Sequence, residues 1–295
     1  MKCIVTGGAG FIGSNLALEL EKLKHDVTIV DNFHSGHKWN IKEFKGKVIT
    51  MDIAEEKIDE KFDVIFHQAA ITDPRYLNEE ETLSKNVIGF KNMLELAKKT
   101  NAKLIYASTA SLYGNTKAPQ KEDQEKELFS AYAQSKIIMD EMASYHFKSM
   151  HIVGLRYFNV FGPREEHKGR PASMIYHLIK QMKSLQNPKL FRNGEHKRDF
   201  IYVRDCVLAN FDAIEAKSGI YNVGTGIATS FNELVKVLNE VLGTNLETEY
   251  FDMPYDVKSY QNFTQADTSN AERYLKFKAK FPLKEAVEEY KEWIK

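Results

Sequence analysis

The feature that most restricts how this chain can fold is the glycine-rich segment TGGAGFIG at residues 6–13. It follows the apolar run KCIVT at residues 2–6 and opens a segment with helical periodicity. In that context a glycine at position 7 or 8 permits a tight turn, Gly10 lets the backbone approach a pyrophosphate, and Gly13 lets a helix pack on a strand. Asp31 ends the next apolar run, about 20 residues further on, as in dinucleotide sites. We therefore predict a dinucleotide-binding strand, turn and helix here.

The first half of the chain alternates apolar runs with segments of helical periodicity. The runs are rich in Val, Ile and aromatic residues and nearly continuous, which is typical of strands buried on both faces. They lie at 2–6, 27–31, 47–52, 64–70, 103–109 and 151–158. Within residues 81–100, one helix face is predicted to comprise Leu83, Val87, Phe90, Leu94 and Ala97. The alternation predicts an α/β fold with a doubly wound, Rossmann-like parallel sheet and right-handed crossovers.

After residue 160 the pattern is less regular. A loop at 161–171 leads to a predicted helix at 172–185, and the spacing of Ser230 and Glu233 predicts a capping box at the start of another helix. We predict two domains: a dinucleotide-binding domain of residues 1–160 and 199–227, and a smaller, discontinuous α/β substrate domain of residues 161–198 and 228–295.

The charge balance argues against several classes of partner. Lys plus Arg equals Asp plus Glu at 41 each, so no overall field favours nucleic acid or an anionic membrane. No segment is long and apolar enough to span a bilayer, and the N-terminus enters a strand without a signal peptide. Two cysteines, Cys3 and Cys206, are expected to be reduced core residues of a cytoplasmic protein. No His, Cys or Asp cluster has metal-ligand spacing, so no metal is expected.

The acidic residues after the second and third runs bear on the choice of cofactor. Asp31 can accept both ribose hydroxyls of adenosine, which favours NAD. Asn32 and Lys38 could instead hold a 2′-phosphate while Asp31 turns to the 3′-hydroxyl, so NADP stays open. Asp52 is a candidate for binding the adenine amino group, and an exposed loop carboxylate is the alternative.

A tyrosine and a lysine form a candidate acid/base pair. Tyr132 and Lys136 are four residues apart, so on a helix they share one face. An ammonium beside a phenol, together with a positive nicotinamide ring, is expected to lower the tyrosine pKa toward that of a general base. Thr109 ends a predicted strand, where ligands of doubly wound sheets bind, and its hydroxyl can reach the reacting oxygen. A Y-x-x-x-K match alone is weak, and its context supports it here.

Motifs along essentially the whole chain resemble the extended short-chain dehydrogenase/reductase family of nucleotide-sugar enzymes: TGGAGFIG, HQAA at 67–70, Asn86, ASTASLYG, YAQSK, RYFNVFGP and RDFIYVRD. The resemblance implies that Thr109, Tyr132 and Lys136 are catalytic and that Arg198 reaches the substrate diphosphate. A surface ion pair of Arg198 with Asp199 or Glu195 is the alternative. Where related 4,6-dehydratases carry an Asp-Glu pair, this chain has Ala110 and Ser111, which disfavours dehydration.

Epimerisation through transient oxidation requires the carbonyl intermediate to turn over, so a second proton donor is useful. The segment RYFNVFGPREEHKGRPAS, with PKLF, KRDFIYV and SYQNFTQAD, resembles the ADP-glycero-manno-heptose 6-epimerase subfamily. This resemblance implies that Lys168 is a second acid/base residue opposed to Tyr132 and that C6″ of the heptose is inverted. A UDP-hexose 4-epimerase, a net reductase and a non-catalytic dinucleotide sensor are the alternatives.

The resemblance also implies a set of binding residues, a tightly held, regenerated NADP with NAD as the alternative, and a homo-oligomer. Position 170 departs from the subfamily, because it is Arg where enterobacterial-type sequences have a small residue. The residues expected at the dinucleotide are Gly7, Gly10, Phe11, Ile12, Gly13, Asp31, Asn32, Lys38, Asp52, Gln68, Ala69, Ala70, Asn86, Lys136 and Val160. The residues expected at the nucleotide sugar are Thr109, Asn159, Lys168, Arg170, His177, Phe191, Asn193, Gly194, Arg198 and Tyr260.

Overall fold

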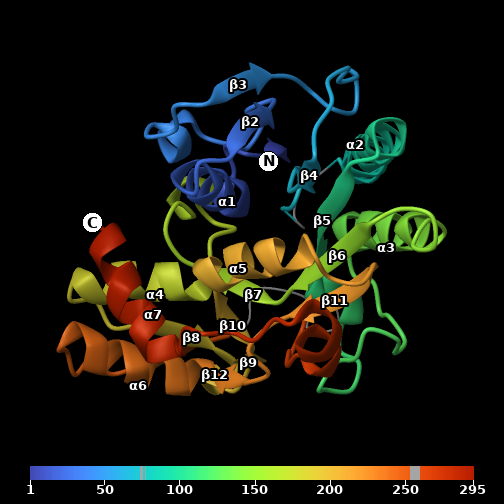
Figure 1. The fold of residues 1–295 in the computed structure, drawn as a ribbon. Helices are drawn as coiled ribbons and strands as arrows, with labels where there is room; N and C mark the ends of the chain where they lie inside the picture. The colour runs from blue at the N-terminus through green and yellow to red at the C-terminus, as the bar shows by residue number, and fades with distance from the viewer. Residues whose placement is uncertain (74–75, 77, 253–259) are drawn as a thin grey trace.

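A seven-stranded parallel sheet forms the centre of the molecule (Figure 1). The structure is a computed structural model that describes residues 1–73, 76, 78–252 and 260–295. The strand order is β11-β6-β5-β4-β1-β2-β3, so the direction of winding reverses between β1 and β4, where ligands of such sheets bind. The predicted doubly wound sheet is confirmed. The strands are β1 (Lys2–Thr6), β2 (Asp26–Asp31), β3 (Lys47–Thr50), β4 (Val64–His67), β5 (Lys103–Thr109), β6 (Ile152–Tyr157) and β11 (Gly219–Val223).

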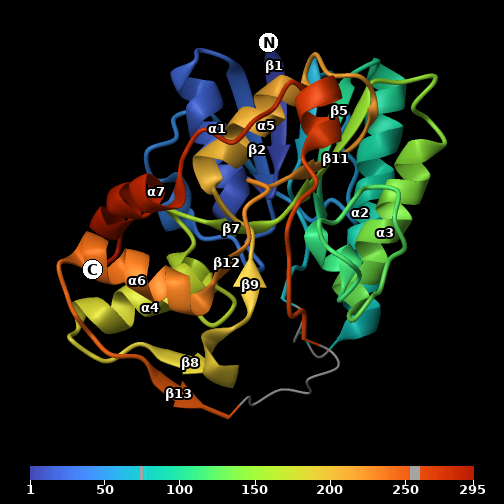
Figure 2. The ribbon, with the colours of Figure 1, turned by 90° about the horizontal axis from the view of Figure 1, so that it is seen from below.

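Helices cover both faces of this sheet, as the two ribbon views show (Figures 1 and 2). On one side lie α1 (Phe11–Lys22) and α5 (Val203–Ala213), and on the other lie α2 (Glu79–Thr100) and α3 (Ala131–Ser144). Each face of the sheet has its own apolar core, and alternate residues of β1 point to opposite faces. Cys3 and Val5 pack with α1 and α5, and Ile4 packs with α2 and α3. This alternation explains why the strands are apolar along their whole length.

Three details of the sheet layer differ from the sequence-based expectations. β3 was predicted to be buried, but it is the sheet edge and Val48 is exposed. The buried face of α2 includes Thr82, Asn86 and Phe90, whereas Leu83 and Val87 are only partly buried. The face is shifted because Asn86 turns inward to bond Ile71 and Ser135. In addition, β11 is not among the strands predicted from the sequence.

The second half of the chain builds a smaller layer with its own apolar core. The capping box of Ser230 and Glu233 is present at the start of α6, as predicted. The remaining strands are β7 (Asn159–Phe161), β8 (Lys189–Phe191), β9 (Lys197–Arg198), β10 (Phe200–Tyr202), β12 (Thr229–Ser230) and β13 (Glu249–Phe251). The helices of this layer are α4 (Met174–Lys183), α6 (Phe231–Leu242) and α7 (Leu283–Tyr290). Short helical turns along the described chain, in either layer, include η1 (Lys38–Ile41), η2 (Ala110–Tyr113), η3 (Glu166–Lys168), η4 (Arg192–Gly194), η6 (Ala271–Leu275) and η7 (Lys291–Trp293).

The division of the chain into two domains remains a prediction. Ala271, Leu275 and Phe277 pack into the core beneath α1 and α5, although they fall within the range assigned to the substrate domain. Their packing favours assigning this segment to the dinucleotide-binding unit.

Candidate active site

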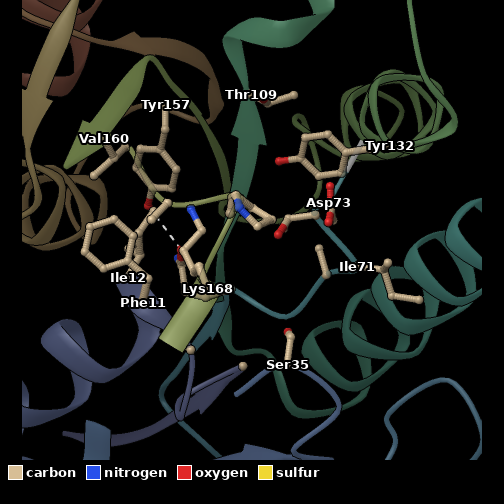
Figure 3. A pocket seen from close by; sticks show the side chains of 18 of the residues that line it. Phe11, Ile12, Ser35, Ile71, Asp73, Thr109, Tyr132, Tyr157, Val160 and Lys168 are labelled. Carbon is tan, nitrogen blue, oxygen red and sulfur yellow. Dashed lines mark hydrogen bonds between the residues drawn. The ribbon is translucent and has the colours of Figure 1, made fainter. Parts of the chain in front are cut away.

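One large cavity, of about 1650 Å³, extends from the glycine loop to the smaller layer. It opens at the carboxyl ends of the central strands, and Figure 3 shows part of its lining. Of the predicted binding residues, all line this cavity except Lys38, Asn193 and Gly194. The tertiary structure therefore brings segments from most of the chain length to one place.

The glycine loop has the geometry that a pyrophosphate requires. Gly7 has φ +67°, and a Cβ there would lie 2.6 Å from the Ala69 nitrogen. A Cβ on Gly13 would collide with the Gly7 carbonyl oxygen. Gly10 precedes α1 and supplies no capping side chain, so the first N–H groups of the helix remain available to phosphate oxygens. These residues fit a dinucleotide.

Asp31 ends β2, lines the cavity and is buried. Its carboxylate accepts hydrogen bonds from the Ala9 nitrogen at 2.9 Å and the Phe33 nitrogen at 2.8 Å. Burial raises the pKa of Asp31, and these two bonds oppose that change. The Lys38 ammonium lies 5.8 Å from the Phe33 ring centre and does not line the cavity. Each carboxylate oxygen of Asp31 thus accepts one backbone N–H.

A charged cluster at the neighbouring end includes Lys85, a residue not predicted from the sequence. Asp52 accepts hydrogen bonds from Lys85 at 2.8 Å and from Asn32 at 3.1 Å. Burial raises the pKa of Asp52, but the bonds from Lys85, Ala54 and Asn32 outweigh it and lower the pKa. Lys85 lines the cavity. A lone lysine within a helix carries no sequence signal that would have identified it.

The predicted catalytic set is assembled at the junction of β5 and α3. Ser130 caps α3, so Tyr132 and Lys136 leave its first turns toward the cavity. Lys136 is fully buried and donates to the Ala107 carbonyl at 2.8 Å, and its Nζ lies 5.8 Å from the Tyr132 ring centre. Thr109 lies close enough to Tyr132 to influence its pKa. The three side chains are therefore brought together as predicted.

The pKa values in the protein alone are set chiefly by burial. Burial raises the pKa of Tyr132 to about 12, and the neighbouring Thr109 hydroxyl opposes this shift. Burial also lowers the pKa of Lys136 to about 8, while Asp140 raises it. The expected lowering of the Tyr132 pKa is not present without a positively charged nicotinamide. A bound oxidised cofactor would supply that charge.

A buried polar network holds α3 against β5. Asp140 accepts hydrogen bonds from Tyr106 at 2.8 Å and Ser108 at 3.1 Å, and it pairs with Arg156 at 2.9 Å. Together with the bond from Lys136 to Ala107, these contacts fix the register of Tyr132 relative to Thr109.

Lys168 reaches the cavity from the other side. It lies in η3, and its Nζ is 5.4 Å from the Phe11 ring centre. Figure 3 places Lys168 and Tyr132 on opposite sides of the pocket. Burial lowers the pKa of Lys168, and Glu165 and Asp73 oppose the shift. The arrangement offers two proton-transfer groups on two faces of one space.

The part of the cavity in the smaller layer combines one buried cation with aromatic rings. Arg198 is 6% exposed and lies 5.1 Å from the Tyr260 ring centre, and the Tyr260 ring in turn contacts Phe191. Within the described chain, neither Asp199 nor Glu195 forms an ion pair with Arg198. Asp199 instead accepts hydrogen bonds from Thr225, Gly226 and Ala266. The guanidinium instead donates to the carbonyls of Lys197 and Gln261, and Arg198 lines the cavity.

The remaining predicted substrate residues occupy different positions. Asn159, Arg170 and His177 line the cavity. Asn193 and Gly194 form a turn with φ +56° and +69°, and the Asn193 carbonyl accepts a hydrogen bond from Asn232 at 2.7 Å. These two residues shape the turn that follows Phe191 and are not among the residues that line the cavity.

Two further lining residues were not predicted to have a role. His67 is buried, its Nδ1 lies 2.8 Å from the Thr6 hydroxyl, and burial and then Lys136 lower its pKa to about 3. Ser111 donates its backbone N–H to the Thr109 hydroxyl oxygen at 3.1 Å. Both residues lie within quoted motifs, but a motif alone does not show which side chains face inward.

The part of the chain that the structure describes contains no group of three or more His, Cys, Asp or Glu residues placed to hold a metal ion. Across residues 1–73, 76, 78–252 and 260–295, none of the helices is long and apolar enough to cross a membrane.

The fold and this site define a class of proteins, the dinucleotide-dependent enzymes that use a Tyr-Lys pair on alcohols and carbonyls. A family model, the NAD dependent epimerase/dehydratase family, matches residues 3–224. The chain belongs to this family, and its cofactor class is NAD(P). The predicted membership of the extended short-chain dehydrogenase/reductase family and the predicted NAD(P)-dependent epimerase activity on a nucleotide sugar are confirmed.

Individual similar proteins have names that specify a substrate. ADP-L-glycero-D-manno-heptose-6-epimerase of Brachyspira hyodysenteriae is 39% identical, covering 90% of this chain and 88% of that protein. The crystal structure of the Helicobacter pylori enzyme of the same name has a TM-score of 0.92 and 39% identity, covering 99% of this chain and 96% of that one. UDP-N-acetylglucosamine 4-epimerase from Methanobrevibacter ruminantium has a TM-score of 0.91 and 29% identity, covering 99% and 97%.

Proposed function

We propose that the chain is an ADP-heptose 6-epimerase that inverts C6″ of ADP-D-glycero-D-manno-heptose. The observation that carries this proposal is the position of Lys168, which shares one cavity with Tyr132 and lies across it (Figure 3). The 39% identity to two enzymes of that name supports the same assignment.

The bound nicotinamide would accept a hydride from C6″ and return it. Thr109 and Lys136 would orient the reacting oxygen and the Tyr132 phenol, and Tyr132 and Lys168 would exchange protons with that oxygen from its two sides. The carbonyl carbon lies outside the sugar ring, so rotation about the bond between C5″ and C6″ presents its other face. Two opposed proton donors match this rotation, because the oxygen ends near a different residue from the one it left.

The rest of the cavity supports an ADP moiety. The Arg198 guanidinium is a charge partner for a diphosphate. The rings of Phe191 and Tyr260, with centres 5.3 Å apart, provide apolar surface for a planar base. A low-dielectric wall around Arg198 strengthens its attraction for phosphate oxygens.

For the cofactor, the ribose end of the cavity supports NAD over NADP. Asp31 presents a carboxylate where a 2′-phosphate would add negative charge, Asn32 is engaged with Asp52, and Lys38 lies outside the lining. The cytoplasmic location and the homo-oligomeric state stay predictions.

The function is tested by single-turnover kinetics with each pure C6″ epimer, following cofactor reduction at the nicotinamide absorbance band. Lys168→Met should lower steady-state epimerisation by about 100-fold or more, as loss of an acid/base group does. It should block cofactor reduction by one epimer and preserve reduction by the other. Tyr132→Phe should show the reverse selectivity.

Lys180→Met is the matched control, because Lys180 is an exposed lysine on the adjacent helix α4. It should behave as the wild type with both epimers. The proposal fails if Lys168→Met affects the two epimers equally, or if the enzyme converts UDP-galactose and leaves ADP-heptose unchanged in an NMR assay.

A further inference from the structure

The segment between β7 and α4 carries Lys168 and is anchored on two sides of the cavity. On the dinucleotide side, Arg164 donates to the Asn15 side-chain oxygen at 3.0 Å and to the Asn40 carbonyl at 3.2 Å. On the side of the smaller layer, the anchors include a hydrogen bond between His177 of α4 and the Arg170 carbonyl at 3.2 Å and the carboxylate of Glu165. The backbone carbonyl of Glu165 also accepts the Lys168 N–H at 3.0 Å, so these two residues belong to one turn.

Glu165 is fully buried, and its carboxylate accepts four hydrogen bonds. One carboxylate oxygen accepts from the Gly162 nitrogen at 3.1 Å, the Ser173 hydroxyl at 2.8 Å and the Tyr290 hydroxyl at 2.9 Å. The other oxygen accepts from the Ser173 nitrogen at 2.6 Å. The carboxylate thus joins the start of the lysine loop to the first residue before α4 and to the last residue of α7.

A carboxylate in this position is costly for stability. All four donors are neutral groups, and among the described residues no Lys, Arg or His forms an ion pair with Glu165. Burying such a charge carries a large desolvation cost even when it is hydrogen-bonded. A neutral side chain could close the same turn at a lower cost. The charge has a second consequence, because it lies near the Lys168 ammonium and raises that lysine's pKa against the effect of burial.

We propose that Glu165 is the positioning residue of Lys168: its carboxylate ties the lysine loop to α4 and α7 and keeps the ammonium directed into the cavity. Tyr290, which is 125 residues further along the chain, supports the same positioning by donating a hydrogen bond to the Glu165 carboxylate. This inference rests on the proposed function, because it concerns the second proton-transfer group of that reaction.

The test is Glu165→Gln in the holoenzyme, with the same single-turnover measurement on each epimer. The glutamine amide has two orientations. If its NH₂ replaces the oxygen that faces the Ser173 N–H, two donors face each other, and if it replaces the other oxygen, the acceptor for Gly162, the Ser173 hydroxyl and Tyr290 is lost. We expect the half-reaction that Lys168→Met blocks to slow by about 10-fold or more, while the half-reaction dependent on Tyr132 keeps its wild-type rate. A merely structural role would slow both half-reactions.

Glu166→Gln is the matched control, because Glu166 is the exposed neighbour in the same turn. It should leave both half-reactions unchanged. Tyr290→Phe removes one of the four hydrogen bonds and should give a smaller slowing of the same half-reaction. This variant decides the question if Glu165→Gln does not fold.

The outcomes separate this inference from the proposed function. If Lys168→Met is selective for one epimer but Glu165→Gln and Tyr290→Phe both match Glu166→Gln, the positioning role is wrong and the function stands. If Lys168→Met shows no selectivity, the proposed function fails first. In the Lys168→Met background, Glu165→Gln should cause no further loss, and an additive loss would also overturn the inference.

Discussion

At the scale of single residues, burial decides more of the chemistry than the residue types alone. Lys136 and Tyr132 stand one helical turn apart, yet burial moves their pKa values to about 8 and about 12 in the protein alone. The phenol is therefore a neutral acid until a cationic ligand arrives. This dependence couples the base to the oxidised cofactor, since the charge that makes the tyrosine reactive also accepts the hydride.

The preference for NAD is a prediction at this scale. Asp31→Asn removes the negative charge beside the ribose, so binding of NADPH should improve relative to NADH by about 10-fold, a change of about 1.4 kcal/mol. The ratio of the two Kd values, measured by nicotinamide fluorescence, is the readout. Loosening of the Ala9 and Phe33 contacts should weaken both ligands alike and cancel in this ratio. An unchanged ratio would show that the carboxylate does not discriminate.

At the scale of elements, the turn between β1 and α1 depends on two glycines that cannot carry a side chain without a shift of the backbone. A Cβ on Gly7 would strike the backbone of Ala69, and a Cβ on Gly13 would strike the backbone of Gly7. By contrast, the exposure of β3 and the choice of the buried face of α2 depend on the elements that pack beside them. β3 is exposed because it lies at the sheet edge. In α2, Asn86 points inward, so the N-terminal part of the helix buries Thr82 and Asn86 and leaves Leu83 and Val87 only partly buried.

Gly13→Ala tests the element directly. Alanine raises helix propensity by up to about 1 kcal/mol, but the added methyl would strike the Gly7 carbonyl oxygen and displace the phosphate-binding turn. We expect cofactor Kd to rise by about 10-fold or more despite the gain in propensity. Ala17→Gly, in the same helix but outside the cavity lining, is the control and should reduce thermal stability without changing Kd. Equal Kd values for Gly13→Ala and the wild type would contradict the fit of this loop to a dinucleotide.

At the scale of the whole molecule, the site exists only where the two layers meet. The sheet layer contributes Tyr132, Lys136 and Thr109, the smaller layer contributes Arg198 and the aromatic rings, and the loop between them contributes Lys168. Figure 3 shows Tyr132, Thr109 and Lys168 around the pocket. In this loop Arg164 donates to Asn15 of α1, and Glu165 accepts from Ser173, which caps α4, so the loop is joined to both layers. Global stability and active-site geometry are therefore linked.

Buried Lys136 makes a prediction about stability as a function of pH. Its pKa is about 8 in the folded protein against an ordinary value of 10.5, so between these values the unfolded chain binds more protons than the folded one. Stability attributable to this residue must then rise with pH from about 8 to about 10, by about 2 kcal/mol. Urea denaturation of the wild type and Lys136→Met at about pH 7, 8, 9 and 10 measures the difference across this range. Lys180→Met should track the wild type, and a difference that is flat with pH would show that Lys136 keeps its charge when buried.

The sequence by itself determined the parallel sheet, the dinucleotide turn and the Tyr-Lys pair, because each depends on local periodicity or on residues close together in the chain. It also placed Lys168 in a loop through resemblance to a family. Only the tertiary structure decided that Lys85 and His67 face the cavity, that Lys38 does not line it, and that Arg198 lacks the surface ion pair considered as the alternative. It alone joined Glu165 to Tyr290, 125 residues away. Such contacts depend on how separate elements pack, and packing is fixed by the competition of all side chains for the same buried space.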